Sequence, residues 1–111
     1  MVLSKPSALD DIKILDFSHL LAGPFATQIF GDFGAQIYKI ERADFGDDFR
    51  RWNFFNKKVG GYTSASYMAW NRNKKSIALD LKKPEAKEII YKMAGSCDVI
   101  IQNFRPGVMA K

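Results

Sequence analysis

Residues 12–40 read IKILDFSHLLAGPFATQIFGDFGAQIYKI, and this stretch decides the fold. It opens with Ile12–Phe17, an apolar run typical of a buried strand. Pro24 suits the first turn of a helix, because its missing N–H has no partner to lose there. Apolar side chains then recur at helical spacing up to a capping Gly34, at Phe25, Ile29, Phe30 and Phe33. Ala35–Ile40 is a second strand, so the stretch predicts a strand–helix–strand unit with parallel strands.

The same alternation returns in the second half of the chain. We expect a short helix over Ser64–Asn71, a strand over Ser76–Leu81, a helix from Pro84 to Gly95 and a strand over Asp98–Gln102. Alternating strands and helices predict an α/β fold, a Rossmann-like open parallel sheet with flanking helices. With 111 residues the chain is long enough for one domain, 1–111, and too short for two.

The segment Glu41–Gly61 differs in kind, since it is polar and Gly-rich yet carries five aromatic residues: Phe45, Phe49, Trp52, Phe54 and Phe55. Such aromatic residues either cover a core or form a packed lid or an interface. Loops of this length are uncommon unless they have a function. We therefore favour the lid or interface.

Composition narrows the class of protein. A hydrophobic fraction of 47% is typical of a globular chain. Met1–Asp10 lacks the apolar core of a signal peptide, and the single Cys97 fits a reducing compartment, so we expect a cytoplasmic protein with no membrane partner. One His and one Cys cannot form a usual zinc site, so no metal is expected. The net charge of +5 fits nucleic acid, a small polyphosphate ligand or mere solubility; of these we do not expect nucleic acid.

Ligands of open parallel sheets bind at the carboxyl ends of the strands. Those ends are predicted at residues 18–22, 41–42, 80–82 and 103–105. Three of them carry a cation, Arg42, Lys82 or Arg105, which suits a phosphorylated ligand. The turn at 21–24 offers backbone N–H groups near a helix N-terminus, although no GxGxxG or Walker A motif is present. Asp80 either accepts a hydrogen bond from a ribose or adenine group or merely caps a turn before the next helix.

No catalytic constellation stands out. Adjacent strand residues point to opposite faces, which disfavours a Ser–His–Asp interpretation of Asp16, Ser18 and His19. His19 is expected at a strand end, hydrogen-bonded into the core or lining the cleft, and Cys97 as a packing residue. The acidic run Asp44, Asp47 and Asp48 is expected to be a solvated loop rather than a metal site.

Read in order, several blocks of the sequence resemble the class III CoA-transferases, a family that includes formyl-CoA transferase and α-methylacyl-CoA racemase. The matching blocks are Ile14–His19, Leu21–Gln28, Asp32–Ala35, Lys39–Arg42, Gly46–Asp48, Asn71–Ile77, Leu79–Lys82 and Asn103–Met109. They cover nearly the whole chain in the correct order. The resemblance therefore implies an acyl-CoA substrate and the N-terminal part of a transferase domain.

The resemblance also implies which residues contact coenzyme A. These are Leu21, Ala22, Arg42, Leu79, Asp80, Leu81, Lys82, Asn103, Phe104, Arg105 and Lys111, with Trp52 as a possible active-site lining residue. Two departures concern the acyl substrate. Leu21 stands where formyl-CoA transferase has Gln, and Ser66 stands, ungapped, where it has an active-site Tyr, with Tyr67 one place on.

For the reaction, the resemblance implies an Asp carboxylate that attacks the acyl-CoA thioester and a carboxylic acid that accepts the CoA. That Asp lies beyond position 111 in the family, so no catalytic residue is expected here. An interlocked homodimer is also implied. Two alternatives stay open: part of a racemase-type isomerase, or a stand-alone CoA- or nucleotide-binding module without catalysis.

Overall fold

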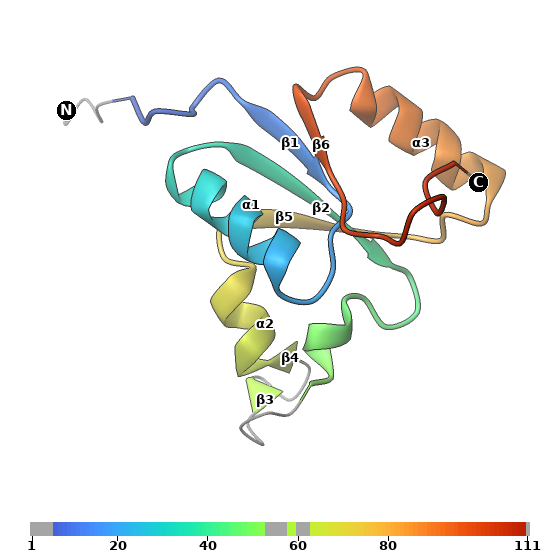
Figure 1. Ribbon diagram of the computed structural model, residues 1–111, viewed down its shortest axis with the longest axis horizontal. Helices are drawn as coiled ribbons and strands as arrows, with labels where there is room; N and C mark the ends of the chain where they lie inside the picture. The colour runs from blue at the N-terminus through green and yellow to red at the C-terminus, as the bar shows by residue number, and fades with distance from the viewer. Residues whose placement is uncertain (1–5, 53–57, 60–62, 111) are drawn as a thin grey trace.

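The structure, a computed structural model, describes residues 6–52, 58–59 and 63–110. Along the chain it contains β1 (Lys13–Asp16), α1 (Ala22–Asp32), β2 (Gln36–Arg42), the 3-10 helix η1 (Asp48–Arg50), β3 (Lys58–Val59), β4 (Thr63–Ser64), α2 (Ala65–Trp70), β5 (Lys74–Leu79), α3 (Pro84–Ala94) and β6 (Val99–Ile101). The predicted strands and helices occur in the predicted order (Figure 1). Between β2 and α2 the structure adds η1, β3 and β4, which were not predicted.

Four strands form one parallel sheet in the order β5-β2-β1-β6, and β3 pairs with β4 in a small antiparallel ribbon. The predicted α/β fold with a parallel sheet and flanking helices is confirmed. The chain runs outward from β1 through β2 to β5 and then crosses back to β6 on the other side of β1. Open parallel sheets bind ligands at such a reversal of strand order.

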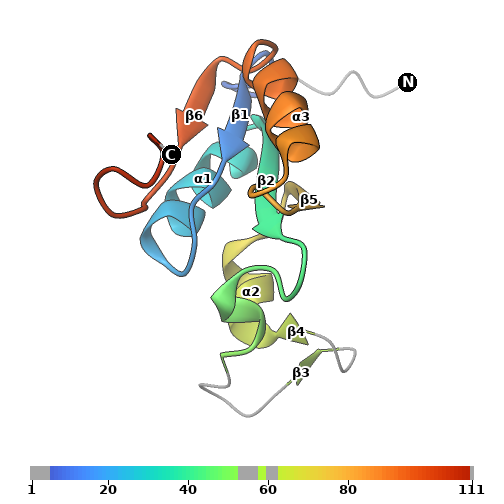
Figure 2. The ribbon, with the colours of Figure 1, turned by 90° about the vertical axis from the view of Figure 1, so that its right-hand side faces the viewer.

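The two long helices cover opposite faces of the sheet, as Figure 2 shows. Neighbouring residues on β1 alternate between these faces. Ile14 belongs to a core cluster with Ala35 and Ile37. Leu15 faces the other way and forms the second cluster with Phe17 and Ile40, against which the apolar side of α3 packs. The side chains on both faces of β1 are thus buried, which explains why the apolar run in this strand is continuous.

Element boundaries differ from the predictions by a few residues. α1 begins at Ala22, so Pro24 is its third residue. β2 continues through Arg42 because it pairs along its length with β5, from Ile37 beside Lys74 to Arg42 beside Leu79. β5 accordingly begins at Lys74 and ends at Leu79. Within the described part of the chain no helix has the length and apolarity needed to cross a membrane.

The aromatic segment after β2 folds back onto the molecule. Phe49 is buried and its ring centroid lies 5.1 Å from that of Trp52. The Phe45 ring contacts two guanidinium groups, those of Arg42 and Arg51. Phe54 and Phe55 lie outside the described residues. The described part of this segment is therefore packed rather than free, and its role as a lid or interface stays a prediction.

Candidate functional site

A cleft of about 580 Å³ opens at the carboxyl ends of the sheet strands. It is lined by Phe17, His19, Ile40, Glu41, Arg42, Ala43, Asp44, Asp48, Leu79, Asp80, Leu81, Lys82 and Phe104. The parallel register of β2 and β5 places Arg42 beside Leu79 at this edge. The sheet thus has a cleft at the edge where the ligand was predicted to bind, and binding there stays a prediction.

The turn after β1 and the segment after β6 are joined by hydrogen bonds on one side of the cleft. The His19 N–H donates to Asn103 Oδ1 at 2.9 Å, and Asn103 Nδ2 donates to the His19 carbonyl at 2.8 Å. The His19 ring lies 5.2 Å from the Phe104 ring, centroid to centroid. These contacts join two segments that are far apart in the sequence into one wall.

His19 lines the cleft, as one of its two predicted roles requires. Its Nδ1 atom is buried and has no hydrogen-bond partner among the described residues. Burial lowers the pKa of the His19 imidazole, and this effect exceeds the opposing attraction of Asp47. The ring is therefore neutral at pH 7 and offers the cleft a hydrogen-bonding group rather than a charge.

Arg42 lies at the rim of the cleft, and its guanidinium group is held by two contacts. Its Nη2 atom is 2.7 Å from Asp48 Oδ1, and its guanidinium carbon lies 3.7 Å from the centre of the Phe45 ring. Stacking on an aromatic face suits the planar guanidinium. A half-exposed arginine held in this way can meet an incoming phosphate.

Asp80 has a structural role in the turn before α3. Its Oδ1 accepts from the Lys82 N–H at 3.1 Å and its carbonyl accepts from the Lys83 N–H at 3.0 Å. The turn-capping alternative is confirmed by these bonds. The residue also lines the cleft, so contact of its carboxylate with a ligand stays a prediction.

Of the predicted contact residues, the cleft brings together Arg42, Leu79, Asp80, Leu81, Lys82 and Phe104. Leu21, Ala22, Asn103 and Arg105 do not line it, although Asn103 braces its wall. Trp52 packs on Phe49 and is not among the lining residues either, and Lys111 lies outside the described residues. Five further residues line the cleft that were not predicted to do so: Phe17, Ile40, Ala43 and the acidic residues Asp44 and Asp48. A signal for the first two was present, since they flank the predicted strand ends.

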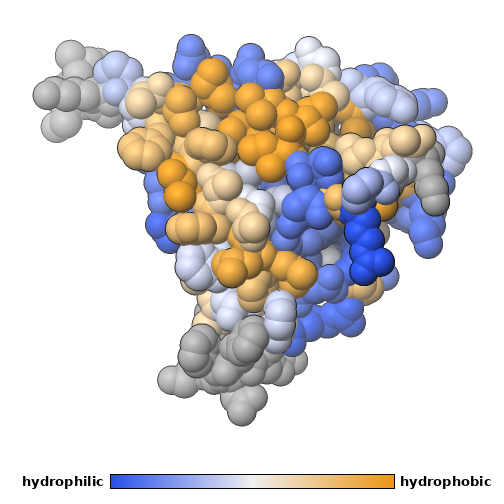
Figure 3. Space-filling model, viewed as in Figure 1, coloured by the Kyte–Doolittle hydropathy of each residue, from blue (hydrophilic) through white to orange (hydrophobic). Residues whose placement is uncertain are grey.

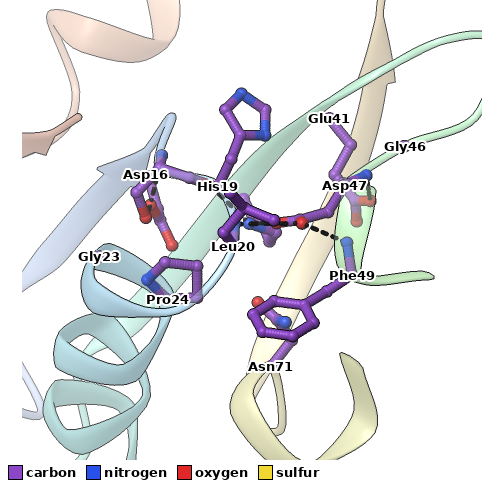
Figure 4. Close-up of polar contacts among 12 residues, drawn as sticks. Asp16, His19, Leu20, Gly23, Pro24, Glu41, Gly46, Asp47, Phe49 and Asn71 are labelled. Carbon is purple, nitrogen blue, oxygen red and sulfur yellow. Dashed lines mark hydrogen bonds and ion pairs between the residues drawn. The ribbon is translucent and has the colours of Figure 1, made fainter. Parts of the chain in front are cut away.

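Beneath the cleft lies an ion pair between Lys39 and Asp47, both side chains 0% exposed, with Nζ and Oδ2 2.9 Å apart. Lys39 Nζ also donates to the Ser18 carbonyl at 2.7 Å. Asp47 Oδ1 accepts from the backbone N–H of Leu20 at 3.2 Å and of Phe49 at 2.9 Å (Figure 4). The prediction that this acidic run is solvated is wrong for Asp47, because a lysine inside an apolar strand requires a buried counter-ion.

Asp16 lies in a second buried cluster, and it does not form a triad with His19. Its carboxylate accepts from Ser18 Oγ and, at 2.6 Å, from Thr27 Oγ1, and it lies 3.4 Å from Lys74 Nζ. The side chains thus join β1 to α1 and β5. Rejection of the Ser–His–Asp interpretation is consistent with these contacts. Among the described residues no group of three or more His, Cys, Asp or Glu side chains is arranged to hold a metal.

Glu41 anchors the loop that follows β2. Its carboxylate accepts from Arg50 at 2.7 and 2.8 Å, from Tyr67 Oη and Ser76 Oγ at 2.6 Å each, and from the Asp47 N–H at 2.9 Å. Burial alone would raise the pKa of this carboxyl, but the bonds from Arg50, Ser76 and Tyr67 outweigh it and lower the pKa to about 2.

This lowered pKa predicts an acid-sensitive fold. Because the folded pKa lies below the ordinary 4.5, the stabilisation by Glu41 is complete above pH 4.5 and is lost as pH falls toward 2. We expect this one carboxylate to account for roughly 3 kcal/mol of the acid-induced loss. Urea unfolding at a series of pH values measures it. Glu41→Gln should flatten the curve in that window, and an unchanged slope would contradict the assignment.

Comparison with known proteins adds to this geometry. The family model described as "CoA-transferase family III" matches residues 9–111. The human protein named succinyl-CoA:glutarate CoA-transferase is 45% identical over 102 residues, covering 92% of this chain and 23% of its own. A formyl-CoA:oxalate CoA-transferase of Rhodopseudomonas palustris is 43% identical, with the same coverage of both chains. The crystal structure of a CAIB/BAIF family protein from Brucella suis matches with a TM-score of 0.87 at 34% identity, over 96% of this chain and 28% of that one. The chain thus spans about a quarter of the length of these relatives.

Proposed function

The chain belongs to CoA-transferase family III, and on that premise we propose that its cleft binds the coenzyme A part of an acyl-CoA thioester. One observation carries the proposal: the ends of β2 and β5, which the resemblance implies contact coenzyme A, meet in a single cleft with Arg42 and Lys82 in its lining. Both cations suit phosphate, Arg42 as a planar fork and Lys82 as a point charge.

The reaction proposed for the whole protein is transfer of CoA from an acyl-CoA to a carboxylic acid. The relatives named above carry the names of succinyl-CoA:glutarate and formyl-CoA:oxalate CoA-transferases, which supports transfer over isomerisation. An enzyme carboxylate attacks the thioester carbonyl and releases the CoA thiolate, which then attacks the enzyme-side carbonyl of the resulting anhydride, forming an enzyme–CoA thioester and expelling the donor acid. The acceptor carboxylate attacks this thioester and releases the CoA thiolate again. The thiolate then attacks the acceptor-side carbonyl of the new anhydride, which gives the acceptor's CoA thioester and frees the enzyme carboxylate. We propose that this carboxylate belongs to an Asp outside the 111 residues and that the 111 residues bind CoA.

We further propose a homodimer in the cytoplasm. Apolar side chains gather on one face of the molecule, as Figure 3 shows. The exposed apolar side chains of α1 are Phe25, Ile29 and Phe30, and the exposed Leu21 and Phe33 flank the helix. An apolar surface of this kind is typical of an interaction site. Sedimentation of the whole protein tests its oligomeric state.

Coenzyme A is expected to protect the chain against thermal unfolding, and Arg42→Ala is expected to weaken that protection. A charge-assisted bond to phosphate contributes about 1.5–3 kcal/mol, so the variant should bind roughly 10- to 100-fold more weakly. Isothermal titration calorimetry and thermal shift measure both effects. Lys92→Ala is the control, because it removes one positive charge from α3 away from the cleft lining. If the wild-type chain shows no binding at millimolar CoA, the proposal is overturned for this chain.

A further inference from the structure

The cleft is more acidic than its cationic rim suggested. Its lining holds the carboxylates Glu41, Asp44, Asp48 and Asp80 against the cations Arg42 and Lys82. Glu41 is neutralised within the protein by Arg50. Coenzyme A brings a pyrophosphate and a further phosphate, and these anions meet carboxylates as well as cations. A carboxylate close to one of these cations would therefore lower the affinity of the cleft for its ligand.

Asp48 is the carboxylate that touches the phosphate-binding candidate. Its Oδ1 lies 2.7 Å from Arg42 Nη2, at the rim of the cleft, and both side chains are about half exposed, 51% and 46%. Two other contacts hold the Arg42 guanidinium in position. Phe45 lies under its guanidinium carbon at 3.7 Å, and Nε donates to the Gly46 carbonyl at 3.5 Å. Asp48 thus occupies a donor edge of Arg42 without being needed to hold the group in place.

The surrounding loop does not depend on the Asp48 side chain. The neighbouring Asp47 is buried and holds the start of η1 through the N–H of Phe49. Glu41 fixes the same loop through Arg50. The Asp48 carboxylate can therefore swing into water while the backbone that carries Arg42 and Phe49 stays in place.

We propose that Asp48 is an internal counter-ion, which occupies the place of a ligand phosphate on Arg42 and is exchanged for it when the ligand binds. This inference rests on the proposed CoA-binding function. Two anions on one guanidinium edge repel each other, and an exposed ion pair is weak enough for a phosphate to displace. The exchange sets the affinity below what the bare arginine would give.

The test compares Asp48→Asn with the wild-type chain in calorimetric titrations with coenzyme A. Asparagine keeps a hydrogen-bond acceptor for Arg42 but removes the competing charge. We expect binding about two- to fivefold tighter, which is the range of an exposed ion pair. The gain should shrink when salt is raised from about 0.01 M to about 1 M, as the screening length falls from roughly 30 to 3 Å.

Asp44→Asn is the matched control, because Asp44 lines the same cleft and makes no ion pair with Arg42 among the described residues. A gain confined to Asp48→Asn supports exchange. An equal gain from Asp44→Asn, or unchanged or weaker binding by Asp48→Asn, overturns it while the CoA site stands. Weaker binding by Asp48→Ala would likewise show that Asp48 positions Arg42. If neither the wild type nor Asp48→Asn binds coenzyme A, the proposed function falls and the inference with it.

Discussion

Asp47→Asn is expected to lower the free energy of unfolding by roughly 3–5 kcal/mol, because it leaves the buried Lys39 ammonium without its counter-ion. The two side chains are fully buried and 2.9 Å apart. Asp47 also accepts the N–H of Leu20, a residue held at a positive φ of 63°. Loss of the carboxylate charge thus weakens both the ion pair and the turn that leads to the cleft.

Urea unfolding of Asp47→Asn, Lys39→Met and the double variant measures this coupling. Each single variant leaves one charge uncompensated, whereas the double variant leaves none, so its loss should be smaller than the sum of the two single losses. Asp48→Asn is the control in the same loop, where loss of an exposed pair should cost about 1 kcal/mol or less. Additive losses from the two single variants would show that the ion pair is not the source of the stabilisation.

The fold was predictable because its signals are local. A buried strand, a proline in the first helical turn and a glycine after the helix all occur within residues 12–40, and the alternation of strands and helices predicts parallel strands. The order of the strands in the sheet was not predicted and comes from the structure. The observed boundaries of a strand differ from the predicted ones where pairing with a neighbouring strand determines its length. β2 runs on to Arg42 because β5 lies beside it, and nothing in the sequence of β2 alone reveals that partner.

The site was predictable to the level of strand ends and no further. Topology gathers the carboxyl ends of the strands, but it does not fix where each side chain points, so Leu21 and Arg105 were expected at the cleft and do not line it. The position of Lys39 within an apolar strand indicates a buried ion pair, since a buried lysine needs a counter-ion. The sequence does not identify Asp47 as that counter-ion, because the path of the loop between the two residues depends on tertiary contacts of Glu41 and Arg50.

Gly23→Ala is expected to lower the free energy of unfolding by about 3 kcal/mol, the upper part of the range for overpacking. A Cβ at Gly23, in the first turn of α1, would overlap the Cβ and Oγ atoms of Ser18. Ser18 cannot turn aside, because its hydroxyl is bonded to the buried Asp16. The helix is held to the same carboxylate by Thr27 at 2.6 Å. The Asp16 carboxylate therefore holds both Ser18 and the helix that carries Gly23 in place.

The matched control is Gly95→Ala, since Gly95 follows α3 with a φ of −65° and a Cβ there would meet its nearest atoms at ordinary contact distances of 3.6 and 3.7 Å. That variant should be neutral or up to about 1 kcal/mol more stable. Ser18→Gly in the Gly23→Ala background removes the overlapping Cβ, so the double variant should lose less than the sum of the single losses. A Gly23→Ala protein as stable as the wild type would show that α1 can shift away from β1. Restoration by Ser18→Gly would instead show that the close approach of α1 to the end of β1, beside His19 and the cleft, requires glycine at position 23.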